Sequence, residues 1–399
     1  MTISGSFLGG GMYDPQENRM LARMVTAMLD QGTERRDKME IREMLASVGA
    51  AISFACGTHW VRFAATCLKQ DMGMVVGLLA EQLREPAFKS ADLDIVKQRV
   101  LAFLEQEKED TGTQAKIKLS QMLYAPEHPN YIPDDTVRAK HVRAVTPADL
   151  KEYHASNLGL GTMTVVAVGD VDAQVVSSAV TKAFGGWRTS PLALRTVGPT
   201  RSEAAAATEY IPMTEKTSVD VIVGQPVGID VNHPDRYPLG IATKILGEDF
   251  SGRLMTTVRD EQGLTYAVYS GISGIQRGIT GHWFTWGTFA PTLLKKGEQA
   301  VLEQVRRWTE DGVTNAEVAE RKENIIGSYK VGLATTGGLA DAILTAIEEG
   351  RSKEYLDEFP KIIAAITPEQ VNEAVKKYID PERFVLVAAG SIDKNGKPL

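Results

Sequence analysis

Two stretches far apart in the chain carry the same signals in the same register. Val145-Thr-Pro-Ala-Asp-Leu150 recurs as Ile366-Thr-Pro-Glu-Gln-Val371. An apolar segment that ends in glycine follows each of them, residues 163–169 in the first case and residues 384–390 in the second. The two Thr-Pro pairs are 221 residues apart, and so are the two closing glycines. Because both pairs are separated by the same number of residues, the spacing indicates a tandem duplication. This period is far longer than a solenoid repeat, so it predicts two similar domains.

Both halves combine helix-period and alternating segments, which appear in blocks and end in a lone strand. Apolar residues at helical spacing predict helices, and period-two alternation predicts strands. The predicted helices are residues 20–29, 37–49, 75–83, 93–119 and 237–246, and the predicted strands are residues 52–54, 61–67, 219–223, 266–270 and 282–289. Within these helices we expect Met39 to face the core and Asp92 to cap the long helix that follows it. The pattern predicts an α+β fold of two tandem α/β-sandwich domains, each a mostly antiparallel sheet with helices on one face.

A segment rich in Pro, Gly and Ala separates the two halves. It contains Pro191, Gly198, Pro199 and a run of four alanines that ends at Ala207. Such composition is typical of a linker. We therefore expect a first domain over residues 1–189, a linker over residues 190–208 and a second domain over residues 209–399.

Composition and charge exclude several classes of function. The formal net charge is −7 and no run of Lys or Arg is present, so we expect no nucleic-acid partner. No stretch is long and apolar enough to predict a membrane span, and residues 1–6 have no features of an export signal. Cys56 and Cys67 are too few for a disulfide framework, and with His59 they lack a fourth metal ligand. These observations predict a cytoplasmic protein with no membrane partner.

Several motifs resemble the inverted-zincin peptidases, the family of insulysin, pitrilysin and the mitochondrial processing peptidase. They are Met28-Leu-Asp-Gln-Gly-Thr33, Leu123-Tyr124 with His128-Pro129, and the stretch from Gly252 to Tyr266. The resemblance covers nearly the whole chain and lies nearest the processing-peptidase branch. It implies two domains per chain and paired chains that enclose a chamber for peptides.

The zinc motif of that family is absent at the matching position. Active members carry H-x-x-E-H just before the Met-Leu…Gly-Thr stretch, with two His as zinc ligands and the Glu as general base. Here Arg23 and Ala27 stand at the two His positions and Thr26 at the Glu position. Glu105, or alternatively Glu107, matches the family's third ligand, although a solvated helix carboxylate is the simpler interpretation. One carboxylate cannot hold catalytic zinc, so we expect no metal in this chain.

The resemblance also implies a surviving pair of substrate-contacting residues in the second half. In the family, an Arg and a Tyr seven residues later donate hydrogen bonds to the bound peptide near the developing oxyanion. Arg259 and Tyr266 have that spacing here, with Gly263 at the turn between them. Alternatively, Arg259 complements a helix end or pairs with Glu248, and Tyr266 is an ordinary sheet aromatic.

Together these features predict a chain that is catalytically inactive alone and acts in a complex with a partner chain. A homologous subunit with H-x-x-E-H would supply the zinc, and this chain would contribute Arg259 and Tyr266 in a heterodimer that hydrolyses peptides. Two other functions stay open. One is a scaffold subunit of a larger complex, and the other is a clamp that binds extended peptides at an open sheet edge.

Overall fold

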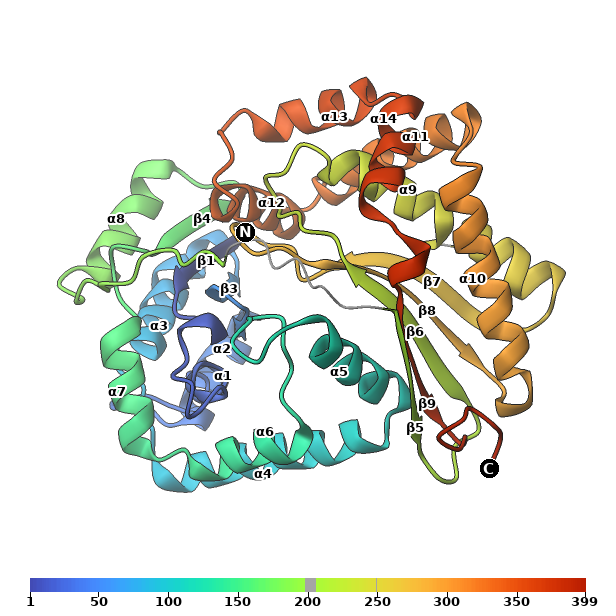
Figure 1. Cartoon of the computed structure of the whole chain (residues 1–399). Helices are drawn as coiled ribbons and strands as arrows, with labels where there is room; N and C mark the ends of the chain where they lie inside the picture. The colour runs from blue at the N-terminus through green and yellow to red at the C-terminus, as the bar shows by residue number, and fades with distance from the viewer. Residues whose placement is uncertain (198–205, 249) are drawn as a thin grey trace. The chain divides into compact units, whose positions relative to one another are not determined.

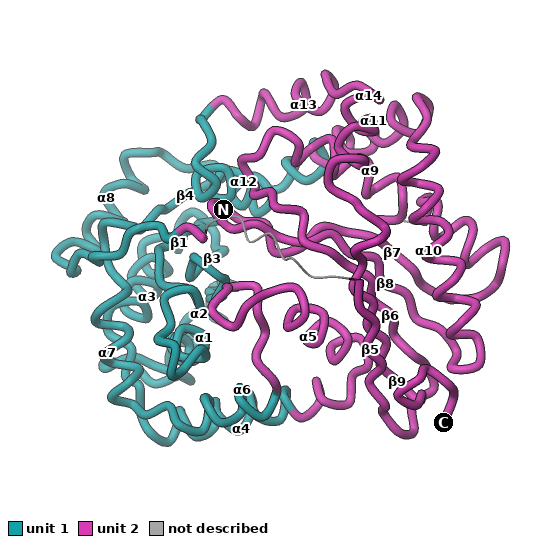
Figure 2. Tube along the Cα trace, in the orientation of Figure 1, with its two compact units in different colours: residues 1–104, 135–195, 330–353 teal, residues 105–134, 196–329, 354–399 magenta. Residues whose placement is uncertain are grey.

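The computed structural model describes residues 1–197, 206–248 and 250–399. These residues form two compact units, coloured separately in Figure 2. The first comprises residues 1–104, 135–195 and 330–353, and the second comprises residues 105–134, 196–329 and 354–399. The chain therefore passes between the two units five times. The prediction of two consecutive domains divided by one linker needs correction on this point.

The first unit is a four-stranded antiparallel sheet with helices on both faces (Figure 1). The strand order is β2-β3-β1-β4. Its strands are β1 (Thr2–Leu8), β2 (Ala51–Cys56), β3 (Trp60–Thr66) and β4 (Thr164–Val168). Its helices are α1 (Leu21–Met28), α2 (Lys38–Ser47), α3 (Met72–Arg84), α6 (Asp135–Ala144), α7 (Pro147–Asn157), α8 (Ala173–Phe184), α12 (Thr336–Glu348) and most of α4 (Ser90–Glu109).

The second unit repeats this plan with one more strand. The strand order is β5-β9-β6-β8-β7, in which only β5 and β9 are parallel. Its strands are β5 (Ala207–Pro212), β6 (Val219–Pro226), β7 (Thr265–Ser273), β8 (His282–Phe289) and β9 (Val385–Gly390). Its helical segments are α5 (Thr111–Leu123), α9 (Arg236–Gly247), the π-helical η3 (Met255–Glu261), α10 (Leu294–Glu310), α13 (Tyr355–Ala365), α14 (Pro368–Tyr378) and most of α11 (Asn315–Gly332). Among the described helices, none has both the length and the apolar character needed to cross a bilayer.

The repeated motifs have the same structural roles in the two units. Thr146 is the N-cap of α7 and Thr367 is the N-cap of α14, and each threonine forms a capping box with the residue three positions later. Gly169 directly follows the next strand β4, and Gly390 is the last residue of β9; their φ angles are +152° and +155°. In this region of φ a side chain is disfavoured, which accounts for the repeated glycine. The duplication thus applies to local conformation as well as to sequence.

Each sheet is covered on its second face by a helix from the other half of the sequence. Helix α5, from the first half, packs on β6 and β9 of the second unit. Helix α12, from the second half, packs on β1 and β4 of the first unit. The exchange explains why the predicted helix 93–119 is wrong: it ends at Glu109, and Asp110 caps the new helix α5 by accepting a hydrogen bond from the Thr113 amide. Helices therefore lie on both faces of each sheet, where the sequence predicted one.

Three further local predictions need correction. Met39 is exposed because α2 buries only its Ile41 face. Asp92 lies in the first turn of α4, which begins at Ser90, so it is not the residue before the helix. Residue Ala207, assigned to the linker, begins β5; residues 198–205 of that linker lie outside the described residues.

Helix α12 is held on the first sheet by an apolar contact and by one polar cluster. Ala340 and Leu344 are buried against Val166 of β4. On β3, Arg62 donates hydrogen bonds to Glu348 through Nε (3.0 and 3.1 Å) and to the hydroxyl of Thr345 (3.0 Å), and it also contacts Asp341. The Glu348 carboxylate is buried, so it depends on Arg62 for its charge partner.

We expect Arg62→Ala to lower the free energy of unfolding by about 2 kcal/mol, because it leaves the Glu348 carboxylate buried without a partner. The double variant Arg62→Ala/Glu348→Ala should regain part of this loss. Urea unfolding monitored by circular dichroism measures both effects. The control is Arg306→Ala, which removes an exposed network with Glu303 and Glu310 and should cost about 0.5 kcal/mol or less. Equal losses at positions 62 and 306 would contradict this account.

Candidate functional site

The three positions that match the zinc motif lie on α1, a helix whose core face is intact. Met24 and Val25 are fully buried, which fixes the helix in the core of the first unit. Arg23 is exposed, Ala27 is half-buried, and the Thr26 hydroxyl donates to the carbonyl of Ala22 at 2.8 Å. A guanidinium and a methyl group cannot coordinate zinc, and Thr26 has no basic group to activate water. The residues present do not fit a catalytic zinc ion.

Two polar side chains accompany this helix: Asp14, which sequence reasoning did not single out, and Cys56, which it considered only as a disulfide or metal residue. Asp14 accepts a hydrogen bond from the amide of Ala22 at 2.7 Å, at the beginning of α1. Burial raises the pKa of the Asp14 carboxyl to about 7, although the Ala22 amide and Arg19 oppose the shift. Burial and the nearby Asp14 raise the pKa of the Cys56 thiol to about 11, although Arg23 and Thr26 oppose the shift. No motif marks Asp14, because its role depends on a loop that returns to the helix eight residues later.

Glu105, the candidate third ligand, lies on α4 after the chain has passed into the second unit. Both carboxylate oxygens of Glu105 accept hydrogen bonds from Lys108, at 2.7 and 2.8 Å. The side chain is 56% exposed, which fits the alternative of a solvated helix carboxylate. Throughout the described residues, no three His, Cys, Asp or Glu side chains cluster so that they can hold a metal ion.

Arg259 and Tyr266 come together at the turn from η3 to β7. Gly263 has a φ of +62°, and the amide of Gly263 donates to the carbonyl of Arg259 at 3.0 Å. The next amide, that of Leu264, donates to the carbonyl of the fully buried Val258 at 3.0 Å. These bonds reverse the chain so that Arg259, on the last turn of η3, faces the first residues of β7.

The two side chains form an exposed aromatic–guanidinium cluster together with Phe250. The Arg259 guanidinium carbon lies 5.4 Å from the ring centroid of Tyr266 and 5.6 Å from that of Phe250, within the range of cation–π contact. Tyr266 is 82% exposed and Phe250 is 77% exposed. Arg259 lies 3.6 Å from Asp260, while Glu248 pairs with Lys244. The suggested pairing of Arg259 with Glu248 is therefore not the one formed. Phe250 was missed because only the fold places it beside Arg259.

The raised pKa of Cys56 predicts slow thiol alkylation. In a Cys67→Ser variant, reaction with iodoacetamide at pH 8 should be about a hundredfold slower than that of an exposed model thiol, because only the thiolate reacts. The rate should keep rising to about pH 11, and Asp14→Asn should accelerate it by removing a negative charge that opposes ionisation. Mass spectrometry of the alkylated peptide measures the rate. The control Asp170→Asn, at an exposed carboxylate beside Lys69, should leave it unchanged, and a plateau near pH 9 would contradict the assignment.

Comparison with known proteins points to one family for this chain. The chain matches the insulinase model of peptidase family M16 over residues 6–126 and the model described as the peptidase M16 inactive domain over residues 144–325. It is 23% identical to an uncharacterized zinc protease of Streptomyces coelicolor, over 93% of this chain and 81% of that protein. It is 22% identical to a Helicobacter pylori protein named non-peptidase homolog YmxG, over 98% of this chain and 89% of that protein.

Solved structures show the same fold. A peptidase M16 inactive domain from Pseudomonas fluorescens superposes with a TM-score of 0.88 at 24% identity, covering 100% of this chain and 94% of that one. A structure described as a protease from Helicobacter pylori gives a TM-score of 0.87 at 15% identity, covering 98% and 94% of the two chains. This chain therefore belongs to peptidase family M16, and it is a member that lacks the zinc-binding residues at the matching positions of α1.

Proposed function

We propose that this chain is the non-zinc-binding subunit of a two-chain zinc metallopeptidase. A homologous partner that carries H-x-x-E-H would hold the zinc ion and supply the general base. This chain would complete the chamber and contribute Arg259 and Tyr266 to the binding of the peptide substrate. By itself it would neither bind catalytic zinc nor hydrolyse peptides.

The geometry of Arg259 and Tyr266 is the observation that carries this proposal. The Arg259 guanidinium is in cation–π contact with two aromatic rings, and its side chain is 31% exposed to solvent. A restrained planar donor set is suited to a peptide carbonyl, because little rotamer entropy is lost on binding. The adjacent Tyr266 hydroxyl offers a second donor, and the exposed Phe250 offers apolar surface for a substrate side chain. Donors placed in this way stabilise negative charge as it develops on the carbonyl oxygen.

Helix α1 retains its packing but lacks zinc-binding residues, which supports a peptidase in which a second chain supplies the zinc site. The helix keeps its buried face and its place beside β2, so the fold of a zinc-binding half persists without its chemistry. A polypeptide that retains this scaffold and an exposed Arg–Tyr pair is suited to act on a substrate whose hydrolysis depends on another subunit. Similarity to the beta subunit of the mitochondrial processing peptidase of Caenorhabditis elegans, 19% identical over 62% of this chain and 53% of that protein, agrees with a multi-subunit setting.

A purely structural role is the second candidate, and the name non-peptidase homolog of the Helicobacter pylori relative favours it. As a scaffold, the chain would assemble with other subunits while Arg259 and Tyr266 made no difference to any peptide. As a standalone clamp, it would bind extended peptides without a partner. These functions therefore differ in what the purified chain and its mixtures do.

The test is reconstitution with a homologous H-x-x-E-H chain encoded beside this one. The mixture should contain about one zinc per pair and cleave unfolded peptides, and neither chain alone should do so. Arg259→Ala and Tyr266→Ala should each lower kcat/KM by about a hundredfold, the scale of one lost oxyanion donor, without changing the zinc content.

Conservative variants separate the contributions of the two side chains. Arg259→Lys keeps the charge but loses the planar donors, and Tyr266→Phe keeps the ring but loses the hydroxyl. Arg306→Ala, an exposed arginine of α10, is the matched control and should leave hydrolysis unchanged. Full activity of Arg259→Ala/Tyr266→Ala would refute the proposal in favour of the scaffold, and peptide binding by the isolated chain would favour the clamp.

A further inference from the structure

Helix α5 leaves part of the second sheet uncovered. The helix packs on β6 and β9, while three aromatic side chains of β7 and β8 on the same side of the sheet, Tyr269, Phe284 and Trp286, stay partly exposed. A cavity of about 370 Å³ lies between these strands, α5 and the loop that follows α5. The described residues that line it all belong to the second unit. A cavity of this size can enclose a small organic ligand.

Hydrogen bonds hold the walls of this cavity in place. Asn130, in the loop after α5, donates through Nδ2 to the carbonyls of Gly274 and Thr280, both at 3.0 Å. The amide of Ile132 donates to the hydroxyl of Ser120 at 3.1 Å. These bonds tie the loop to the β7–β8 hairpin and to α5. The walls are therefore formed before a ligand enters, so binding costs little ordering of the protein.

His282 of β8 presents a hydrogen-bond donor to the cavity. Its Nδ1 lies 2.8 Å from the hydroxyl of Tyr124, which is buried and does not line the cavity. A buried O–H without an acceptor is costly, so Tyr124 donates to Nδ1 and the ring hydrogen stays on Nε2. Burial lowers the pKa of His282 to about 4, so the ring is neutral at neutral pH. Among the described residues, Nε2 has no hydrogen-bond partner.

Lys116 of α5 brings a positive charge to the same cavity. It is the one charged side chain among the described residues that line it. Lys116 is exposed, and it forms no ion pair or hydrogen bond within the described part of the chain. Asp220 interacts with it electrostatically, but the Asp220 carboxylate is buried and accepts a hydrogen bond from the Thr111 hydroxyl. The ammonium group of Lys116 is therefore available to an anionic ligand.

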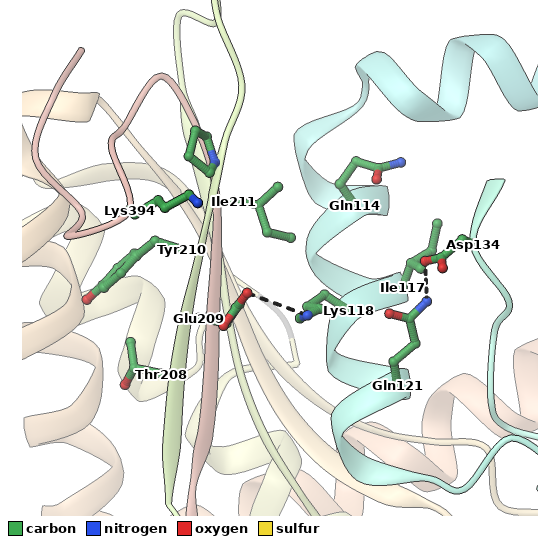
Figure 3. A pocket seen from close by; sticks show the side chains of 11 residues that line it. Gln114, Ile117, Lys118, Gln121, Asp134, Thr208, Glu209, Tyr210, Ile211 and Lys394 are labelled. Carbon is green, nitrogen blue, oxygen red and sulfur yellow. Dashed lines mark hydrogen bonds and ion pairs between the residues drawn. The ribbon is translucent and has the colours of Figure 1, made fainter. Parts of the chain in front are cut away.

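Lys118, two residues later on α5, is neutralised within the protein. It lines a different cavity, between α5 and β5, where Glu209 lies 3.5 Å from it (Figure 3). In that cavity Gln121 also donates to the carboxylate of Asp134 at 2.7 Å. These polar groups satisfy one another, so they favour no ligand. The contrast makes Lys116 and His282 the better candidates for a binding site.

The remaining lining selects an apolar ligand body. Leu119 and Ile222 are buried, and the ring of Phe284 lies beside them. A fully hydrated inorganic anion would leave this surface without a partner, and a cation would be repelled by Lys116. A carboxylate joined to an apolar group matches both the donors and the apolar wall.

We propose that this cavity binds a small monocarboxylate with an apolar body, either a free organic acid or the C-terminal residue of a peptide. The carboxylate would accept hydrogen bonds from Lys116 and from Nε2 of His282, and the apolar body would lie against Leu119, Ile222 and Phe284. The site does not include Arg259 or Tyr266, and it stands whether or not the chain is part of a peptidase.

The probe is 3-phenylpropanoate, and 3-phenylpropanamide is its uncharged match. Ligand-observed NMR with the full chain should show saturable binding of the acid. The amide should bind at least about tenfold more weakly, because it cannot accept charge-assisted hydrogen bonds. Inorganic phosphate should not compete, because it has no apolar body. N-acetylglycylphenylalanine separates the two sources: tighter binding than that of 3-phenylpropanoate indicates a peptide C-terminus, and weaker or equal binding indicates a free acid.

Variants of the chain locate the site. Lys116→Met should weaken binding of the acid at least about tenfold and leave binding of the amide unchanged, and Lys118→Met is the matched control without effect. His282→Phe keeps a ring but removes Nε2, so it should also weaken binding of the acid. Circular dichroism reports whether each variant is folded, and the exposed position of Lys116 keeps the test valid if His282→Phe is not. No saturable binding of the acid at about 10 mM, equal binding of acid and amide, or unchanged binding by Lys116→Met would overturn the proposal.

Discussion

The exchange of α5 and α12 is the constraint on which the rest of this structure depends. A sheet with one bare apolar face is unstable in water, and each unit covers that face with a helix from the other half of the sequence. Each half of the duplicated sequence therefore lacks a piece of its own core. The ion pair of Arg62 with the buried Glu348 also fixes the orientation of α12 on the first sheet. A buried carboxylate has to be paired, and only one placement of the helix brings Glu348 to Arg62.

Core packing also explains why helix α1 is kept although the zinc-binding residues are absent from it. Met24 and Val25 are buried, and replacing either would leave a cavity in the core. Of the three motif positions, Arg23 is exposed, and the small side chains of Thr26 and Ala27 fit against the core, so the helix packs without the zinc-binding residues. Asp14 and Cys56 now lie nearby with raised pKa values, which means that both favour their neutral forms more than in water.

The second half differs because its distinctive residues are exposed. Packing does not require Tyr266 and Phe250 at 82% and 77% exposure, and the turn at Gly263 holds Arg259 against both rings. Exposed aromatic surface around a restrained cation is costly to leave in water and useful for binding a peptide. In the proposed function, the first half is the catalytically inactive scaffold and this exposed cluster binds the peptide, and the difference in exposure is the physical basis of that proposal.

By itself, the sequence determined the features that depend on near neighbours in the chain. The duplication, most of the strands and the absence of ligands at Arg23 and Ala27 could all be read from spacing and residue type. Only the tertiary structure decided which sheet α5 and α12 cover, that Asp14 returns to the start of α1 and that Phe250 joins Arg259. The reason is physical: helical and strand periods report which face of an element is apolar, but not which distant apolar face meets it.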